Sequence, residues 1–162
     1  SWMSSTASSA TKIMITKQEV ISLNFILDVH EGWPPVAVES IPSKSVSGGF
    51  EVLDAPLYVQ GLSRGDVVRI DVGNSDEVIR WSHIVRSQHS TVWLLRLNTP
   101  NNIEDVLAKV RDLSCSTVSL PSQGSYAIDV PGDVKLERVE ALLENLDSAT
   151  VAVAYPSLRH VE

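Results

Sequence analysis

Apolar and polar residues alternate with a period of two through much of residues 12–90, and this spacing predicts short β-strands. Turn sequences such as Ser47-Gly48-Gly49 and Asn74-Ser75-Asp76 separate the alternating segments at intervals of about 8 to 12 residues. The pattern predicts a small bent β-sheet or a partly open barrel. Its apolar positions are Ile13, Ile15, Val20, Ile21, Leu23, Phe25, Leu27, Val36, Val38, Ile41, Phe50, Val52, Val67, Val68, Ile70 and Val72.

The spacing changes after residue 90. Strands are predicted at 91–97, 116–120, 126–130 and 150–155, the last of them ended by Pro156. Two amphipathic helices lie between these strands, with Asn102 and Asp133 as their predicted N-caps. Their apolar faces consist of Ile103, Val106, Leu107, Val110 and Leu113, and of Leu136, Val139, Leu142, Leu143 and Leu146. The order βαββαβ is that of the split-βαβ, ferredoxin-like motif, so we predict an α+β fold.

These two patterns predict the organisation of the chain. Residues 1–11 are expected to form a disordered tail, in which Ser1-Trp2 is interpreted as a cloning remnant before Met3. Residues 12–90 form the β-rich module and residues 91–162 the ferredoxin-like module. The predicted core consists of Val36, Val38, Val68, Ile70, Trp93, Leu95, Leu107, Val110, Val139 and Leu143.

Charge and cysteine content narrow the possible partners. The net charge is −7 with a pI near 5.0, which disfavours binding to a nucleic-acid backbone and suits a basic protein partner. No apolar run approaches the roughly 20 residues of a membrane helix, so no membrane association is expected. Cys115 is the only cysteine, which favours a reducing, cytoplasmic location.

The segment RSQHST (86–91) is the densest polar cluster in the chain. Its histidine and hydroxyl groups are residue types that support general-base or nucleophilic chemistry. A triad also needs an orienting carboxylate, and none stands at a diagnostic spacing. His89 and Ser90 would point to opposite faces of an extended strand. We therefore favour a structural junction between the modules, with a binding site and a catalytic site as the alternatives.

The remaining polar motifs indicate structural roles and no catalytic or metal-binding role. The four histidines lack the spacing of a zinc site, so neither a metal nor a cofactor is expected. GLSRGD (61–66) precedes a strand and is predicted to be a β-turn, because a phosphate loop precedes a helix. Trp33 stands before Pro34-Pro35, at the start of a strand. We predict that it is buried at the module boundary with its indole N–H bonded, in preference to an exposed platform.

Three segments resemble a known bacterial family. They are PPVAVESI (34–41), GGFEVLDAPLYVQGLSRGDVVRI (48–70) and IVRSQHSTVWL (84–94). Together they are similar to the domain-of-unknown-function family 4265 over about residues 31–97. Gln88 departs from the small residue, usually glycine, expected before the histidine. The resemblance implies no activity.

The sequence favours a non-catalytic protein-binding module, in its most concrete form a bacterial immunity or antitoxin protein that neutralises a basic toxin. A small-ligand sensor built on the ferredoxin-like module is the first alternative, and an enzyme using His89 and Arg86 is the second. Homodimer formation is left open. The candidate binding residues are Trp33, Tyr58, Arg64, Arg86, Ser87, His89 and Ser90.

Overall fold

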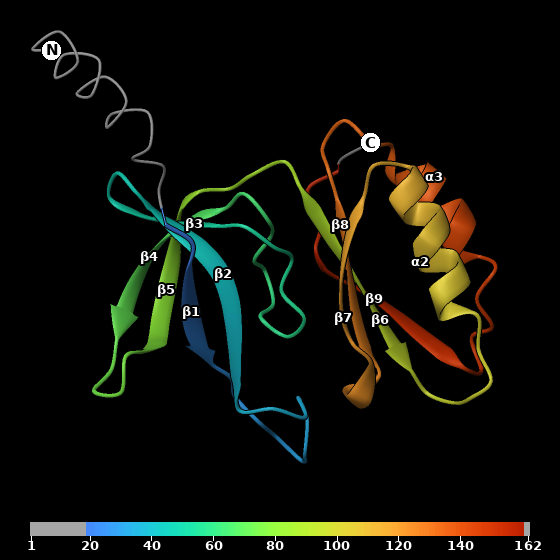
Figure 1. Cartoon of the computed structure of the whole chain (residues 1–162), viewed down its shortest axis with the longest axis horizontal. Coiled ribbons are helices and arrows are strands. Elements are labelled where there is room, and N and C mark those ends of the chain that lie inside the picture. Colours follow the sequence, from blue (N-terminus) through green and yellow to red (C-terminus); the bar gives the residue numbers. More distant parts are fainter. Residues whose placement is uncertain (1–18, 161–162) are drawn as a thin grey trace, which may run out of the picture.

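The computed structural model describes residues 19–160, and its N-terminal half is a closed β-barrel (Figure 1). Consecutive strands pair antiparallel, and β1 closes the barrel by pairing in parallel with β5 at Asn24 and Phe25. The barrel is thus closed where a partly open one was expected. Ile13 and Ile15, the first predicted strand positions, lie outside the described residues. The strands are β1 (Ile21–Ile26), β2 (Val38–Val46), β3 (Gly49–Val52), β4 (Val67–Val72) and β5 (Glu77–Val85).

The barrel interior confirms part of the predicted core and corrects the register of β2. Val68 is fully buried, and Ile70 packs against the barrel core from a partly buried position. Val38 is exposed and Val36 only half-buried, so the prediction that both are core residues is wrong. The inward residues of β2 are instead Glu39, Ile41 and Ser43. Neighbouring residues of a strand face opposite sides, so burial of Glu39 turns Val38 outward.

The C-terminal half is a four-stranded sheet with the order β7-β8-β6-β9. All neighbouring strands pair antiparallel, and two helices cover one face of the sheet (Figure 1). The chain therefore has the predicted α+β class and the element order β-α-β-β-α-β. The elements are β6 (Ser90–Arg96), α2 (Ile103–Asp112), β7 (Ser116–Leu120), the 3₁₀ turn η1 (Pro121–Gln123), β8 (Ser125–Val130), α3 (Leu136–Leu143) and β9 (Val151–Ser157).

Both helices bury the faces that their spacing predicts. Leu107, Val110 and Val139 are fully buried, and Leu143 nearly so. Asn102 is the N-cap of α2, although its side chain bonds the carbonyl of Asn145, and it is the neighbouring Asn101 side chain that accepts from the backbone N–H of Ile103 at 3.1 Å. Lys135, and not Asp133, occupies the N-cap position of α3.

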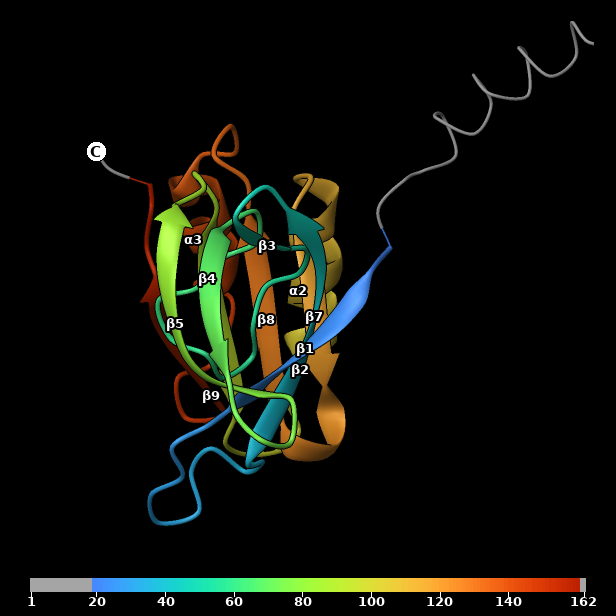
Figure 2. The same ribbon diagram turned by 90° about the vertical axis from the view of Figure 1, so that its left-hand side faces the viewer.

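The barrel covers the face of the second sheet that the helices leave open. Figure 1 shows the sheet between the barrel and the helices, and Figure 2, viewed from the barrel side, shows the sheet behind the barrel strands. Val92 and Leu94 of β6 are buried beneath the helices. Trp93 and Leu95 were predicted as core residues but are only half-buried on the face toward the barrel, where the Trp93 indole donates to the carbonyl of Pro56 at 2.8 Å. The apolar sequence of β6 follows from this burial on both faces.

None of the helices within residues 19–160 is long and apolar enough to cross a membrane.

Candidate functional site

Glu39 anchors the segment between β3 and β4 by presenting its carboxylate to three consecutive backbone N–H groups. Its Oε2 accepts from Leu57 at 2.6 Å, and its Oε1 accepts from Tyr58 at 2.9 Å and from Val59 at 3.1 Å. Burial raises the pKa of Glu39, and these hydrogen bonds lower it by less, so the net shift is upward. The three bonds fix Tyr58, whose hydroxyl donates across the module boundary to Ser125 at 2.6 Å.

An apolar cavity of about 300 Å³ lies between this segment and the second sheet. The cavity remains open because Ala152, Ala154 and Ser125 are small residues on the sheet beneath it. Its polar side chains are already engaged, since Tyr58 bonds Ser125 and Trp93 bonds Pro56. It therefore suits an apolar group. The side chains and backbone that line it come from Trp33, Leu57, Tyr58, Trp93, Leu94, Leu95, Ser125, Tyr126, Ala152, Val153 and Ala154.

Trp33 forms one wall of this cavity and remains open to solvent. A tight turn carries it, because the backbone groups of His30 and Trp33 bond each other at 2.9 and 3.0 Å. Its ring meets Tyr58 in a T-shaped contact, with centroids 5.9 Å apart. Trp33 is 47% exposed, so the prediction that it is buried at the boundary is wrong. No bond from its indole N–H to another described residue is found.

Beside the cavity runs β9, an edge strand of the second sheet. Its central residues carry no charge, and Val153 and Tyr155 are 39% and 40% exposed. We call the edge formed by β9 together with Trp33 and Tyr58 the β9–Trp33 surface: Ala152 and Ala154 lie on its cavity side, whereas Val153 and Tyr155 alternate with them and lie on the helix side of the sheet. Acidic residues border both sides of it: Glu31 and Asp28 are exposed near Trp33 in sequence, with Asp28 paired to His30 at 3.0 Å, and on the helix side Glu140 accepts a hydrogen bond from the Tyr155 hydroxyl at 3.2 Å.

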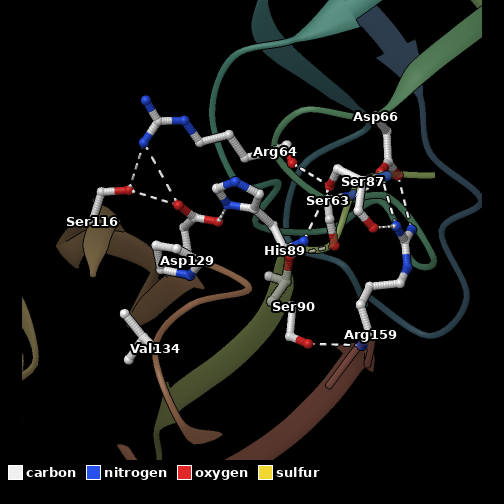
Figure 3. A network of polar contacts seen from close by, with 12 residues as sticks. Ser63, Arg64, Asp66, Ser87, His89, Ser90, Ser116, Asp129, Val134 and Arg159 are labelled. Atoms are coloured by element: carbon white, nitrogen blue, oxygen red, sulfur yellow. Dashed lines mark hydrogen bonds and ion pairs between the residues drawn. The ribbon is translucent and has the colours of Figure 1, made fainter. Parts of the chain in front are cut away.

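A second, polar group of residues joins the two modules, with Asp66 at its centre (Figure 3). The Asp66 side chain is fully buried and accepts two bonds of 2.9 Å from the Arg159 guanidinium. It also accepts from His83 at 2.7 Å and from the backbone N–H groups of Ser63 and Ser87 at 2.9 and 2.8 Å. Burial acts to raise the pKa of Asp66, but the bonds from Arg159, Ser87, Ser63 and His83 together bring it below its ordinary value.

His89 belongs to a neighbouring cluster around Asp129, whose side chain is 1% exposed. The His89 Nδ1–H donates to Asp129 at 2.7 Å, and Ser116 donates to the same carboxylate at 3.1 Å. The Arg64 guanidinium lies 3.6 Å from Asp129 and donates to Ser116 at 3.1 Å. Figure 3 shows these four side chains converging from both modules. The cluster thus links the barrel to β7 and β8.

The hydroxyl groups near His89 are bonded elsewhere. The Ser87 hydroxyl donates to the carbonyl of Arg64 at 2.6 Å and accepts from the His89 backbone, not from its ring. Ser90 accepts from the backbone N–H of Arg159 at 2.7 Å and contacts His160 Nδ1 at 2.6 Å. The His160 Nε2–H faces the carbonyls of Pro131 and Val134, so Nδ1 accepts the Ser90 proton.

Comparison with known families identifies the chain. The model of the domain-of-unknown-function family DUF4265 matches residues 39–153, which is most of its length. The chain belongs to the DUF4265 family. A solved structure described as a novel crystal structure of a hypothetical protein from Neisseria gonorrhoeae shares its fold, with a TM-score of 0.64 at 16% identity. That match covers 88% of this chain and 96% of the other. No curated protein matches the sequence.

In this DUF4265 chain, the candidate residues named from sequence fall into two separate groups. Trp33 and Tyr58 lie together at the apolar cavity. Arg64, Ser87, His89 and Ser90 lie at the polar junction between the modules. Arg86 joins neither group, because it is exposed and no described residue bonds its guanidinium.

Sequence reasoning missed the four charged residues that organise the DUF4265 site: Glu39, Asp66, Asp129 and Arg159. A signal existed for Glu39, which stands two residues before Ile41 and so shares its inward face. Asp66 and Arg159 are 93 residues apart, and no spacing rule connects them. Asp66 lies in GLSRGD, which was predicted to be a β-turn, and a turn gives no reason to expect a buried carboxylate.

Within residues 19–160, no group of three or more histidine, cysteine, aspartate or glutamate side chains is placed to hold a metal ion. Cys115 is buried, and burial, followed by the charge of Asp129, raises the pKa of its thiol to about 11. It is therefore protonated at neutral pH and a weak metal ligand.

Proposed function

We propose that this DUF4265 protein is a non-catalytic binding protein that recognises another protein. The observation that carries the proposal is the β9–Trp33 surface, where an uncharged apolar edge strand adjoins an open apolar cavity. Natural proteins usually shield edge strands with charges, prolines or covering segments, and extended apolar patches on their surfaces usually mark interaction sites. The central residues of β9 carry no such shielding, and Trp33 adds a half-exposed aromatic ring beside them.

The polar junction supports the non-catalytic part of the proposal. A serine nucleophile needs a histidine base within hydrogen-bond reach. Ser87 bonds backbone groups, and His89 donates to Asp129. Ser90 does bond a histidine, His160, at 2.6 Å, but Ser90 is fully buried and the other ring nitrogen of His160 faces the carbonyls of Pro131 and Val134, where a triad has a carboxylate. Every fully buried polar side-chain atom of the described residues has a partner. This degree of internal pairing is what a structural junction requires.

We further propose that the protein is an immunity or antitoxin protein and that its C-terminal half is a ferredoxin-like module. The sheet order β7-β8-β6-β9, with antiparallel neighbours and two crossover helices, supports the ferredoxin-like assignment. The net charge of −7 supports a basic partner, because opposite charge accelerates encounter between proteins. A toxin that acts on nucleic acid would carry such a basic surface.

Co-expression with the product of the adjacent gene tests this function. We expect that product alone to arrest bacterial growth and co-expression of the full chain to restore it. Purified, the two proteins should form a complex. An adjacent product that is harmless, or toxicity that co-expression leaves unchanged, would contradict the proposed function.

Variants of His89 separate binding from catalysis in the same assay. His89→Gln retains a hydrogen-bonding side chain but lacks a base near neutral pH, so it should protect as well as the wild type. His89→Ala leaves the buried Asp129 without one partner and should lower the free energy of unfolding by about 1–3 kcal/mol. A well-folded His89→Gln protein without protective activity would show that His89 acts chemically.

A further inference from the structure

We infer that the partner supplies an extended segment that adds to β9 as a further strand and inserts one large apolar side chain into the cavity beside Trp33. Basic residues flank that anchor in the partner segment. The inference rests on the proposed function and specifies its mode of recognition.

The open edge of β9 is the first support for strand addition. Within the described chain β9 pairs only with β6, so its other edge presents backbone N–H and C=O groups without a strand partner. Pro156 interrupts the C-terminal end of β9, and its carbonyl accepts from the backbone N–H of Gly61 at 3.0 Å. The preceding residues 151–155, Val-Ala-Val-Ala-Tyr, contain neither proline nor charge, the two features that block pairing at an edge, so this stretch is the part available to a further strand. An extended peptide gains main-chain hydrogen bonds at such an edge, and its alternate side chains determine specificity.

The register of β9 then places the anchor. Ala154 pairs with Trp93 and Ala152 with Leu95, so these four side chains share the face of the sheet that borders the cavity. A strand added beside β9 would lie about 4.8 Å away, with every second side chain on that same face. Because the alanines are small, a large side chain from the added strand can reach over them into the cavity.

The chemistry of the cavity selects an apolar anchor. The Tyr58 hydroxyl and the Trp93 indole are both already bonded, so a polar group entering the cavity would lack partners and lose its hydration. A volume of about 300 Å³ accommodates a leucine, phenylalanine or tryptophan side chain. Aromatic walls around one buried anchor are typical of an interface hot spot.

Charge around the surface determines what flanks the anchor. Glu31 is exposed on the turn that carries Trp33, Asp28 lies just before that turn and pairs with His30 at 3.0 Å, and Glu140 of α3 bonds Tyr155 on the helix side of the edge. Lysine or arginine on either side of the anchor would meet these carboxylates. Pairing between two copies of β9 would instead bring their acidic borders together, so a separate basic segment is the better fit.

Selection from a phage-displayed library tests the inference with random peptides of about ten residues, long enough to cover a strand. The target is the full-length protein. We expect enriched peptides that combine alternating apolar residues with flanking Lys or Arg. The best synthetic peptide, labelled with fluorescein, then serves as the probe for affinity measurements. No enrichment, or enrichment of acidic peptides, would overturn the inference.

Two variant pairs locate the binding. Ala154→Phe fills the cavity and should weaken binding of the peptide at least about tenfold, as should Trp33→Ala. Ile79→Ala is the matched control for Trp33→Ala, because Ile79 on β5 is also 47% exposed. Val153→Lys should weaken binding, whereas Ile84→Lys, at a β5 residue of similar exposure (40%), should not. Circular dichroism identifies any variant that fails to fold, and Trp33→Ala, which alters an exposed side chain, provides the test if Ala154→Phe misfolds.

The salt dependence of binding and the toxin assay distinguish an error in the binding mode from an error in the proposed function. Raising NaCl from about 50 mM to about 500 mM should weaken peptide binding while leaving the melting temperature nearly unchanged. If the full chain protects cells but Ala154→Phe and Val153→Lys protect equally well, the binding mode is wrong and the proposed function stands. A hydrophobic small molecule retained in the purified protein, or a dimer that Val153→Lys dissociates, would overturn the inference in favour of a ligand sensor or of self-association.

Discussion

At the scale of single residues, Asp66 carries the strongest structural role. Its buried carboxylate receives five hydrogen bonds, and its bidentate partner Arg159 comes from the far end of the chain. A buried ion pair contributes little compared with a well-packed apolar pair, but removing one partner leaves an uncompensated charge inside the protein. The effect of a substitution at Asp66 is therefore set by the buried Arg159 guanidinium, which loses its carboxylate partner.

We predict that Asp66→Ala lowers the free energy of unfolding by about 3–5 kcal/mol, because the guanidinium of Arg159 then lacks its carboxylate. Asp71→Ala is the matched control. Asp71 also pairs with an arginine, Arg80, at 3.3 Å, but both side chains are exposed. A pair of this kind contributes about 0–1 kcal/mol. Urea titrations of the two variants provide the measurement, and equal losses would contradict the central role of Asp66.

The two buried carboxylates should respond to pH in opposite directions. The pKa of Asp66 lies below its ordinary value of 3.8, so the folded protein binds that proton less tightly than the unfolded chain does. Its contribution is present above that value and is lost as pH falls through the folded-state pKa. The pKa of Glu39 lies above its ordinary value of 4.5, so its contribution is present below that value and is lost as pH rises through the folded-state pKa.

We therefore predict opposite slopes when each carboxylate is compared with its amide variant. The stability difference between wild type and Asp66→Asn should shrink as pH falls from about 5 to about 2. The difference between wild type and Glu39→Gln should shrink as pH rises from about 4 to about 7. Chemical denaturation at a series of pH values measures both slopes. Two slopes of the same sign would show that one of the carboxylates is assigned to the wrong environment.

At the scale of elements, helices could be predicted from the sequence more fully than strand registers. The apolar spacing in α2 and α3 has one interpretation, because residues three or four apart share a helix face. At the start of β2 the alternation predicted Val38, together with Val36 just before the strand, on the inside, and this is wrong. Hydrogen bonds to Glu39 from a distant segment select the other register, and no local pattern reports them. Pro156 likewise lies within β9, where its missing N–H costs little at an edge.

Leu107 provides the test of the helix faces. It is fully buried on α2, so Leu107→Ala should lower the free energy of unfolding by about 2–5 kcal/mol through lost burial and the cavity left behind. Leu97→Ala removes the same atoms from an exposed position, and its loss should be within about 0.5 kcal/mol. Thermal or urea unfolding measures both. A change below about 0.5 kcal/mol for Leu107→Ala would mean that the face of α2 is assigned wrongly.

At the scale of the whole molecule, the sequence indicated where the chain passes from one module to the other but not which residues bond across that junction. RSQHST runs from the link after β5 into the start of β6, and its partners could not be found from the sequence. The bonds that join the modules connect Asp66 to Arg159, Tyr58 to Ser125 and His89 to Asp129, separated by 93, 67 and 40 residues. Contacts over such distances depend on how two finished modules pack. The acidic border of the β9–Trp33 surface has the same origin, since strand and loop meet only in the folded chain.

The density of these bonds predicts that barrel and sheet unfold as one unit. Separating them would expose the apolar cavity walls and leave Asp66, Asp129 and Arg159 without partners. We expect the free-energy cost of this exposure to exceed the entropy that either module gains on separation. Hydrogen exchange in the wild type should therefore give β4 and β8 the same opening free energy. In Asp66→Ala, the amides of β4 should exchange faster than those of β8. The barrel loses its bonds to Arg159, whereas the sheet is still covered by its two helices. Two separate opening free energies in the wild type would instead establish independent domains, and would make the junction a contact surface with no part in global stability.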